Sequence, residues 1–234
     1  MKFTHNPHPN SLILRSKETP KGRFYYSENK NLWYPSVTTV TGYSKKTFFN
    51  EWRKKPGNEE YLLRAQDRGN VLHEAIENYI NNRGFPVVSE TVKQEYIDVF
   101  NCMVDHLNRI DNIRLQEKPL LSDCIRIAGR VDCIGDYCGV PSIIDFKGSS
   151  KPKKAEWIQN YFEQATCYAV MYQEMYGISV KNIVILVGCD NGTAQEFIRP
   201  IHPYIKLLAH SVKAYWRENS FEELQETLNQ TPTT

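Results

Sequence analysis

The sequence predicts an α/β fold, and three observations lead to this class. Apolar residues recur every three or four positions over about 59–82, 90–108 and 155–176, which is typical of amphipathic helices. Between the second and third of these helices, short runs of alternating apolar and polar residues are separated by turn residues, which indicates an antiparallel meander. The run at 180–187 is apolar on both faces, as expected for a buried strand that follows a crossover helix.

The composition is compatible with one globular domain outside the membrane. Hydrophobic residues make up 41% of the 234 residues, which is enough for a packed core, and no apolar run is long enough to cross a bilayer. Residues 1–17 contain no apolar signal core. Because no linker separates two cores, we expect a single domain over residues 1–234.

Within this domain we expect four parts. They are an N-terminal arm at 21–43, a helical part at 59–109, a core at 115–200, and a C-terminal helix and tail at 203–234. The arm is predicted to be extended, with aromatic and β-branched residues on both sides of a polar turn at 29–31. An edge strand is expected at 193–199. Pro203 is expected to begin the last helix, and the polar tail from Glu222 is expected to be frayed.

The charge balance does not by itself indicate a partner. A net charge of +2 is too small to predict nucleic-acid binding, so that prediction depends on local clusters. Basic residues gather at 45–55 and again at 147–154. Either cluster could be solvated surface or could bind phosphate, and the second lies next to acidic residues that suit a metal ion.

Two neighbouring predicted strands each contain an acidic residue. In the second strand, Asp145 and Lys147 alternate with Ile144 and Phe146, so both polar side chains are predicted to lie on one face. Asp132, in the strand before it, would bring a second carboxylate to the same place. Two carboxylates and the main-chain carbonyl of Phe146 suit a hard divalent cation. Such an ion polarises a phosphodiester and activates water, while Lys147 could orient that water or stabilise the transition state.

Other polar residues could belong to this site or have structural roles. His73 and Glu77 share a face of the first long helix, although a histidine on a helix is more often packed or at the surface. Gln164 and Tyr168 lie four residues apart on the third helix, where a tyrosine is more often part of the core. An Asp-x-Lys pair alone is also explained by a surface ion pair.

Taken together, these motifs resemble the PD-(D/E)xK nuclease superfamily and its RecB-like branch. In the order of that branch, they are Arg68-Gly69-x-x-x-His73 with Glu77, Gly129-Arg130-Val131-Asp132, Asp145-x-Lys147 and Gln164-x-x-x-Tyr168. Residues 35–38 and 149–153 are most similar to the mitochondrial genome maintenance exonucleases and their bacterial and phage relatives. The resemblance covers about residues 34–188.

The resemblance implies a central mixed β-sheet flanked by helices, which is a restriction-endonuclease-like core, with helical N-terminal additions. It implies a Mg²⁺- or Mn²⁺-dependent DNA exonuclease that acts on single-stranded DNA or flaps with free ends, in DNA replication, recombination or repair. The implied metal ligands are His73, Asp132, Asp145 and the carbonyl of Phe146. The implied catalytic residues are Lys147, Asp145, Asp132 and Glu117. The expected DNA contacts are Arg68, Ser36, Thr38, Trp33, Lys151, Lys153, Gln164 and Tyr168.

The N-terminal arm has further groups that could meet a nucleic acid. Tyr25, Trp33 and Tyr34 could stack on unpaired bases, or they could pack in the core. The hydroxyl groups of Ser36 and Thr38 could bind a phosphate, or they could cap the segment that follows.

Two departures from the family pattern qualify the resemblance. Gly148 follows Lys147 where several relatives have threonine, which removes a hydroxyl group. No cysteine follows Cys189, so we expect no iron–sulfur cluster of the kind found in some RecB-like nucleases. With no signal in the N-terminal residues, we expect the cytoplasm of a bacterium or of a phage-infected cell. The alternatives are a restriction-type or junction-resolving endonuclease on the same core, and a nucleic-acid-binding module that does not cut.

Overall fold

The protein has a central β-sheet of five strands in the order β4-β5-β6-β7-β8. The structure is a computed structural model that describes residues 2–84 and 93–230. The strands are β4 (Ile110–Ser122), β5 (Ile127–Tyr137), β6 (Val140–Ser149), β7 (Asn182–Cys189) and β8 (Ala194–Pro200). All neighbouring pairs are antiparallel except β6 and β7, which are parallel. The sheet is therefore mixed, which confirms the predicted meander, crossover and edge strand.

Local backbone preferences explain the two connections next to β6. Cys138 and Gly139 have φ angles of 50° and 78°, so a two-residue turn joins β5 directly to β6. This left-handed conformation matches the twist of an antiparallel hairpin. From β6 to β7 the chain returns through α6 (Gln159–Tyr176), because parallel strands need a crossover. Gly177, with a φ angle of 69°, ends α6 as predicted.

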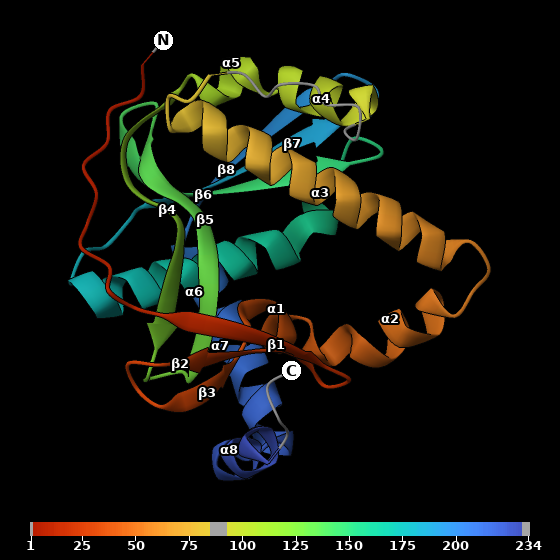
Figure 1. Cartoon of the computed structure of the whole chain (residues 1–234), viewed down its shortest axis with the longest axis vertical. Coiled ribbons are helices and arrows are strands. Elements are labelled where there is room, and N and C mark those ends of the chain that lie inside the picture. Colours follow the sequence, from red (N-terminus) through yellow and green to blue (C-terminus); the bar gives the residue numbers. More distant parts are fainter. Residues whose placement is uncertain (1, 85–92, 231–234) are drawn as a thin grey trace.

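Helices cover both faces of the central sheet, so the core has three layers (Figure 1). On one face, α6 and α7 (His202–Glu218) pack against residues such as Ile143 and Ile185. On the other face, α3 (Asn58–Ile80), α4 (Gln94–Asn101) and α5 (Val104–Leu107) pack against residues such as Ile144 and Phe146. The structure thus confirms the α/β class with a mixed sheet flanked by helices.

The helical part between the arm and the central sheet differs from the prediction in its details. Helix α3 is 23 residues long and ends at Ile80, with Asn81 as C-cap, two residues before the predicted end at 82. The helix expected at 90–108 is two shorter helices, α4 and α5, with the break at Cys102 and Met103; residues 90–92 lie outside the described part. The helix expected from Ala155 begins as a 3-10 turn, η2 (Ala155–Ile158), before α6.

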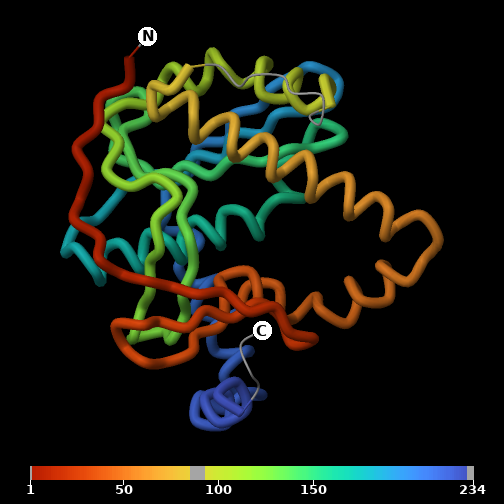
Figure 2. The backbone as a smooth tube through the Cα atoms, in the orientation of Figure 1, coloured from red at the N-terminus to blue at the C-terminus, as the bar shows by residue number. Residues whose placement is uncertain are grey.

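The N-terminal part forms a second, three-stranded sheet that lies against one end of the long β4 and β5 strands (Figure 1). Its strands are β1 (Leu14–Thr19), β2 (Gly22–Ser27) and β3 (Leu32–Pro35). The predicted hairpin of the arm is confirmed as β2 and β3, whereas β1 was not predicted. Figure 2 shows residues before β1 running beside β4, where Asn6 and His8 donate main-chain hydrogen bonds to Ile113 and Arg114. Strand β1 pairs with β2 across a short turn, but its charged sequence has no alternation of apolar and polar residues from which a strand could be predicted.

The extended conformation expected at 37–40 is wrong. The chain turns into helix α1 (Val37–Thr41) because the Ser36 hydroxyl accepts a hydrogen bond from the main-chain N–H of Thr39 at 3.0 Å. Val37 and Val40 are then buried against α6 and α7. Tertiary burial and a serine cap outweigh the β-propensity of this β-branched sequence. The chain continues through η1 (Tyr43–Lys45) and α2 (Lys46–Arg53) into α3.

The frayed tail expected from Glu222 is also wrong. After α7, which contains Pro203 in its first turn as predicted, the chain forms α8 (Phe221–Asn229). The Ser220 hydroxyl caps α8 by accepting a hydrogen bond from the N–H of Glu223 at 3.3 Å. Leu228 packs against Phe24 of β2, which fixes this helix on the outer face of the N-terminal sheet. Among the described helices, none is long and apolar enough to span a bilayer.

Candidate active-site cleft

The predicted acidic residues lie in a cleft of about 890 Å³ between the two sheets and α3. The side chains around it come from α3, from β4, β5 and β6, from α6, and from the N-terminal sheet. The residues with predicted metal, catalytic or DNA-contact roles that line the cleft are Ser36, Thr38, His73, Glu117, Asp132, Asp145, Lys147, Gln164 and Tyr168. The tertiary structure therefore gathers most of the predicted site in one place.

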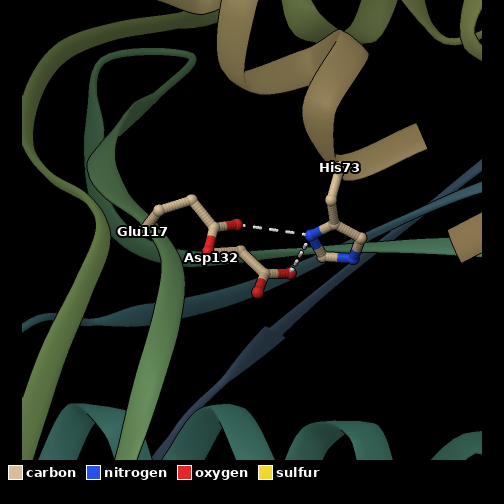
Figure 3. A group of neighbouring side chains, drawn as sticks. All are labelled: His73, Glu117 and Asp132. Atoms are coloured by element: carbon tan, nitrogen blue, oxygen red, sulfur yellow. Dashed lines mark hydrogen bonds and ion pairs between the residues drawn. The ribbon is translucent and has the colours of Figure 1, made fainter. Parts of the chain in front are cut away.

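His73, Glu117 and Asp132 point toward one another from α3, β4 and β5 (Figure 3). The Nδ1 atom of His73 lies 3.4 Å from Oε1 of Glu117 and 3.8 Å from Oδ2 of Asp132. One ligand atom from each of the three side chains lies within 4.8 Å of the others. Burial opposes a charge on the His73 ring, but the nearby carboxylates of Asp132 and Glu117 raise the pKa of His73.

Glu117 is held by an unusual backbone conformation and by Arg130. Its φ angle is 47°, in the left-handed region that residues with a side chain rarely adopt. The Nε atom of Arg130 on β5 donates a hydrogen bond to the Glu117 carbonyl at 2.8 Å and lies 3.3 Å from its carboxylate. Backbone strain of this kind is concentrated at functional sites and is maintained by surrounding contacts. Arg130 is the contact that fixes the Glu117 carboxylate beside His73.

Asp132 is oriented by the main chain of the neighbouring strand. The pairing of β5 with β6 ends at Cys133 and Ile144, so the main-chain N–H of Phe146 further along β6 is not bonded to the main chain of β5. The Oδ2 atom of Asp132 accepts a hydrogen bond from the N–H of Phe146 at 2.9 Å instead. This bond brings the Asp132 carboxylate to the segment that contains Asp145 and Lys147.

Asp145 and Lys147 lie on one face of β6, opposite the buried Ile144 and Phe146, as the alternation predicts. The Lys147 ammonium lies 2.5 Å from Oδ2 of Asp145 and 5.4 Å from the centre of the Tyr161 ring. Burial raises the pKa of Asp145 to about 6, although the charge of Lys147 opposes this shift. Burial disfavours the charged form of Lys147, yet the carboxylates of Asp145 and Asp132 raise the pKa of its ammonium.

The donor set of the cleft fits a divalent cation. The Nδ1 atom of His73 lies 3.4 and 3.8 Å from one oxygen of each carboxylate, and at these separations both atoms of each pair could bind one ion at roughly 2.1 Å, the bond length of Mg²⁺ to oxygen. Carboxylate oxygens suit Mg²⁺ and Mn²⁺, and an imidazole nitrogen adds affinity for transition metals. The Asp145 carboxylate is paired with Lys147. Among the described side chains, the third member of the cluster with His73 and Asp132 is therefore Glu117 and not the expected Asp145.

Gln164 and Tyr168 of α6 line the cleft behind β5 and β6. The ring of Tyr168 lies against the backbone of Gly129. A Cβ atom on Gly129 would lie only 2.9 Å from the Tyr168 ring. Only glycine fits this close approach. Burial raises the pKa of Tyr168 well above its ordinary range, so its hydroxyl stays protonated and can donate a hydrogen bond.

Four residues with a predicted DNA-contact role do not line this cleft. Trp33 is only 4% exposed and packs with Phe24 and Leu228 on the outer face of the N-terminal sheet. Arg68 is buried, and its Nη1 atom donates hydrogen bonds to both carboxylate oxygens of Asp190 at 3.0 and 2.8 Å. Lys151 and Lys153 follow β6 outside the group of lining residues.

Gly148 and Ser36 have structural roles that the sequence motifs do not reveal. A Cβ atom at Gly148 would lie 3.1 Å from Nε of Arg68, so the glycine makes room for the arginine side chain. The Ser36 hydroxyl is engaged as the cap of α1 and lies 3.0 Å from the Thr38 hydroxyl. Both hydroxyl groups nevertheless belong to residues at the wall of the cleft.

The cleft also contains residues that sequence reasoning missed. Arg130, quoted above only as part of a motif, shares a strand face with Asp132, so the two-residue period of a strand could have identified its role. Tyr161, whose ring lies 5.4 Å from the Lys147 ammonium, comes three residues before Gln164 on α6, so helical periodicity could have identified it as a neighbour of the cleft. Leu12 and Leu14 line the cleft from the N-terminal sheet, but no local signal connects them with the acidic residues.

No family model matches the chain. Mitochondrial genome maintenance exonuclease 1 of Homo sapiens is 27% identical over 203 residues, covering 78% of this chain and 55% of the relative. The Mus musculus protein of the same name is 26% identical over 216 residues, covering 83% of this chain and 61% of the relative. This chain is therefore similar to somewhat more than half the length of these curated relatives.

The crystal structure of a candidate exonuclease from Eubacterium rectale has a TM-score of 0.50 and 10% sequence identity, covering 70% of this chain and 68% of that chain. By sequence, the chain is related to proteins that are named as exonucleases. At 10% identity, the crystal structure speaks for the fold alone, and it supports the α/β architecture of a mixed sheet flanked by helices.

Proposed function

We propose that this protein is a metal-dependent DNA exonuclease that hydrolyses phosphodiester bonds in single-stranded DNA or in flaps with free ends, in DNA replication, recombination or repair. The observation that supports this most strongly is one cleft that holds both the His73, Glu117 and Asp132 cluster and the Asp145 and Lys147 pair. The curated relatives are named as exonucleases, which supports the same reaction.

The residues of the cleft would have different roles in the reaction. His73, Glu117 and Asp132 would hold Mg²⁺ or Mn²⁺, with Asp145 at their side. When bound, such an ion supplies a Lewis acid for a phosphate oxygen and lowers the pKa of a water molecule. The Lys147 ammonium, whose charge is favoured by Asp145, would orient the attacking water and stabilise negative charge on the phosphorus centre.

The proposal is tested with end-labelled single-stranded DNA in Mg²⁺ or Mn²⁺. The wild-type protein should shorten the strand from an end, and Asp145→Asn should slow cleavage at least 100-fold, by analogy with the loss of one electrostatic group in other active sites (about 10²–10³-fold). Asp105→Asn on α5, an exposed acidic residue outside the group that lines the cleft, is the matched control and should cleave like the wild type. Equal cleavage by Asp145→Asn would show that the active site lies elsewhere.

Two further substrates separate the proposal from other nuclease activities. Closed circular single-stranded DNA has no end, so an exonuclease leaves it intact, whereas an endonuclease on the same core would open it. EDTA should abolish cleavage and added Mn²⁺ should restore it. Tight DNA binding without any cleavage in either metal would identify a nucleic-acid-binding module instead.

A further inference from the structure

The inner face of the N-terminal sheet forms an apolar wall of the active-site cleft. Register places Ser16 of β1 opposite Tyr25 of β2, so Leu14, Ser16, Arg23 and Tyr25 share one face of this sheet. These four residues and Leu12 all line the cleft that contains Asp132 and Lys147. The other face of the sheet, which includes Phe24, is covered by α8.

Of the three aromatic residues of the arm that suit base stacking, only Tyr25 lies at the cleft. Trp33 and Tyr34 are 4% and 1% exposed, so their rings belong to the packed interior. Tyr25 is partly exposed, lines the cleft and, like Leu12 and Leu14, packs against the buried cluster that contains Tyr34. An aromatic ring on a rigid strand is the usual platform for an unpaired base.

The segment in front of β1 is fixed rather than free to close over the cleft. Asn29, in the turn after β2, accepts a hydrogen bond from the N–H of Ile13 at 2.8 Å and donates one to the carbonyl of Ser11 at 3.2 Å. The N–H of Glu28 donates to the Ile13 carbonyl at 3.1 Å. The apolar wall is therefore already in place before a substrate binds, which reduces the entropic cost of binding.

The charges of the two walls differ in a way that orients a bound strand. The α3 wall contains Glu74 and Glu77, which repel phosphate groups. Among the described lining residues, the N-terminal sheet contributes no carboxylate, and the charge of its Arg23 is paired with Glu18 of β1. A strand whose phosphate lies near Asp132 and Lys147 would therefore avoid the α3 wall and turn its bases toward the N-terminal sheet.

We propose that Leu12, Leu14 and Tyr25 form a subsite for one unpaired base of a single-stranded nucleic acid, next to the phosphate at the acidic cluster. The base stacks on the Tyr25 ring and contacts the two leucine side chains. A base that is paired in a duplex cannot offer this face, so the subsite selects unpaired ends. This inference rests on the proposed function for the position of the phosphate, but base binding can be measured without cleavage.

The test combines a protein variant with an altered substrate. Binding of a fluorescein-labelled single strand is measured by anisotropy in EDTA at low salt, with an abasic nucleotide placed at each position in turn. For the wild type, one position should reduce affinity about fivefold to a hundredfold, the range expected for one base-aromatic stack. Tyr25→Ala should bind the intact strand with an affinity reduced by the same factor. In this variant, an abasic nucleotide at that position should cause no further loss of affinity. Tyr25→Phe should behave like the wild type.

Matched controls make the result specific to this face of the sheet. Tyr26→Ala alters the next tyrosine on β2, on the opposite face, and should keep the abasic effect. Affinity for a blunt duplex should change less than twofold in Tyr25→Ala. If Tyr25→Ala does not fold, Tyr25→Leu retains apolar volume without a ring and should give the same loss.

The outcomes separate the two proposals. Unchanged single-strand affinity in folded Tyr25→Ala or Tyr25→Leu, or an abasic effect that persists in these variants, would overturn the base subsite while cleavage by the wild type still stands. Loss of the abasic effect in a protein that cleaves no DNA in Mg²⁺ or Mn²⁺ would support the subsite and reject the proposed exonuclease.

Discussion

At the scale of single residues, the cleft depends on a close contact that only glycine permits. A Cβ atom on Gly129 would lie 2.9 Å from both the Tyr168 ring and a methyl group of Val37. Gly129→Ala should therefore lower the free energy of unfolding by about 1–3 kcal/mol, the usual cost of overpacking. It should also slow DNA cleavage, because Tyr168 must move.

Chemical denaturation of the purified variants checks this prediction. Gly69→Ala on α3 is the matched control, because a Cβ atom there meets nothing within 4 Å. It should be neutral or should stabilise the helix by up to about 1 kcal/mol, since alanine has the higher helix propensity. Equal stability of Gly129→Ala and the wild type would contradict the packing described for Tyr168.

At the scale of elements, Arg68 holds α3 against the end of the central sheet. Its side chain is 7% exposed and pairs with Asp190, which follows β7, while its Nη2 atom lies 3.4 Å from the carbonyl of Gly148. His73 lies on the same helix, little more than one turn further along. The contact therefore fixes the position of α3 along the sheet, and with it the position of the His73 ring relative to Glu117 and Asp132.

A double-mutant cycle measures this contact. Asp190→Ala should destabilise the protein by about 1–3 kcal/mol, less than the 3–5 kcal/mol typical of fully buried pairs, because Asp190 is 38% exposed. Arg68→Met should lower the free energy of unfolding less in the Asp190→Ala background than in the wild type. In that background the buried Arg68 guanidinium already lacks its partner, so its removal breaks no ion pair. Strictly additive effects would show that the pair is not coupled. Arg68→Lys should not replace the arginine, because an ammonium cannot reproduce the planar guanidinium contacts.

At the scale of the whole molecule, Glu196 joins parts of the fold that are distant in sequence. It lies on β8 and accepts hydrogen bonds from Tyr137 at the end of β5 and from Arg109 after α5, the latter at 3.0 Å, while His106 of α5 lies 3.4 Å away. Burial opposes ionisation of Glu196, but the bonds from Tyr137 and His106 and the charge of Arg109 lower its pKa.

This shift predicts a pH dependence of stability. A carboxyl group whose pKa is lower in the folded state stabilises the protein above its unfolded pKa of about 4.3, and this contribution is lost as the pH falls through the folded pKa. Glu196→Gln should be less stable than the wild type by about 1 kcal/mol at pH 7, because hydrogen bonds to a charged group contribute roughly 1.5–3 kcal/mol and neutral ones roughly 0.5–1.5 kcal/mol. The difference should narrow below about pH 4.5. Thermal unfolding from pH 3 to 8 checks this, and a difference independent of pH would contradict it.

Local sequence was enough to predict the parts of the fold that depend on short-range periodicity. The α3 and α6 helices, the meander of β4 to β6 and the parallel strand β7 were predicted because apolar spacing reports which faces become buried. The common face of Asp145 and Lys147 follows from the two-residue period of a strand for the same reason. In contrast, α1 and α8 pack against partners that lie far away in the chain, and β1 has a charged sequence without apolar alternation, so local propensity did not predict these three elements.

The sequence by itself determined which chemical groups this protein has and that Asp145 and Lys147 lie side by side. Only the tertiary structure decided that His73 meets Glu117, 44 residues away, and that Tyr25 rather than Trp33 or Tyr34 faces the cleft. Periodicity describes one element at a time, whereas these contacts depend on how α3 and the N-terminal sheet pack across β4 and β5. That packing results from burial of apolar surface over the whole chain, which no short motif encodes.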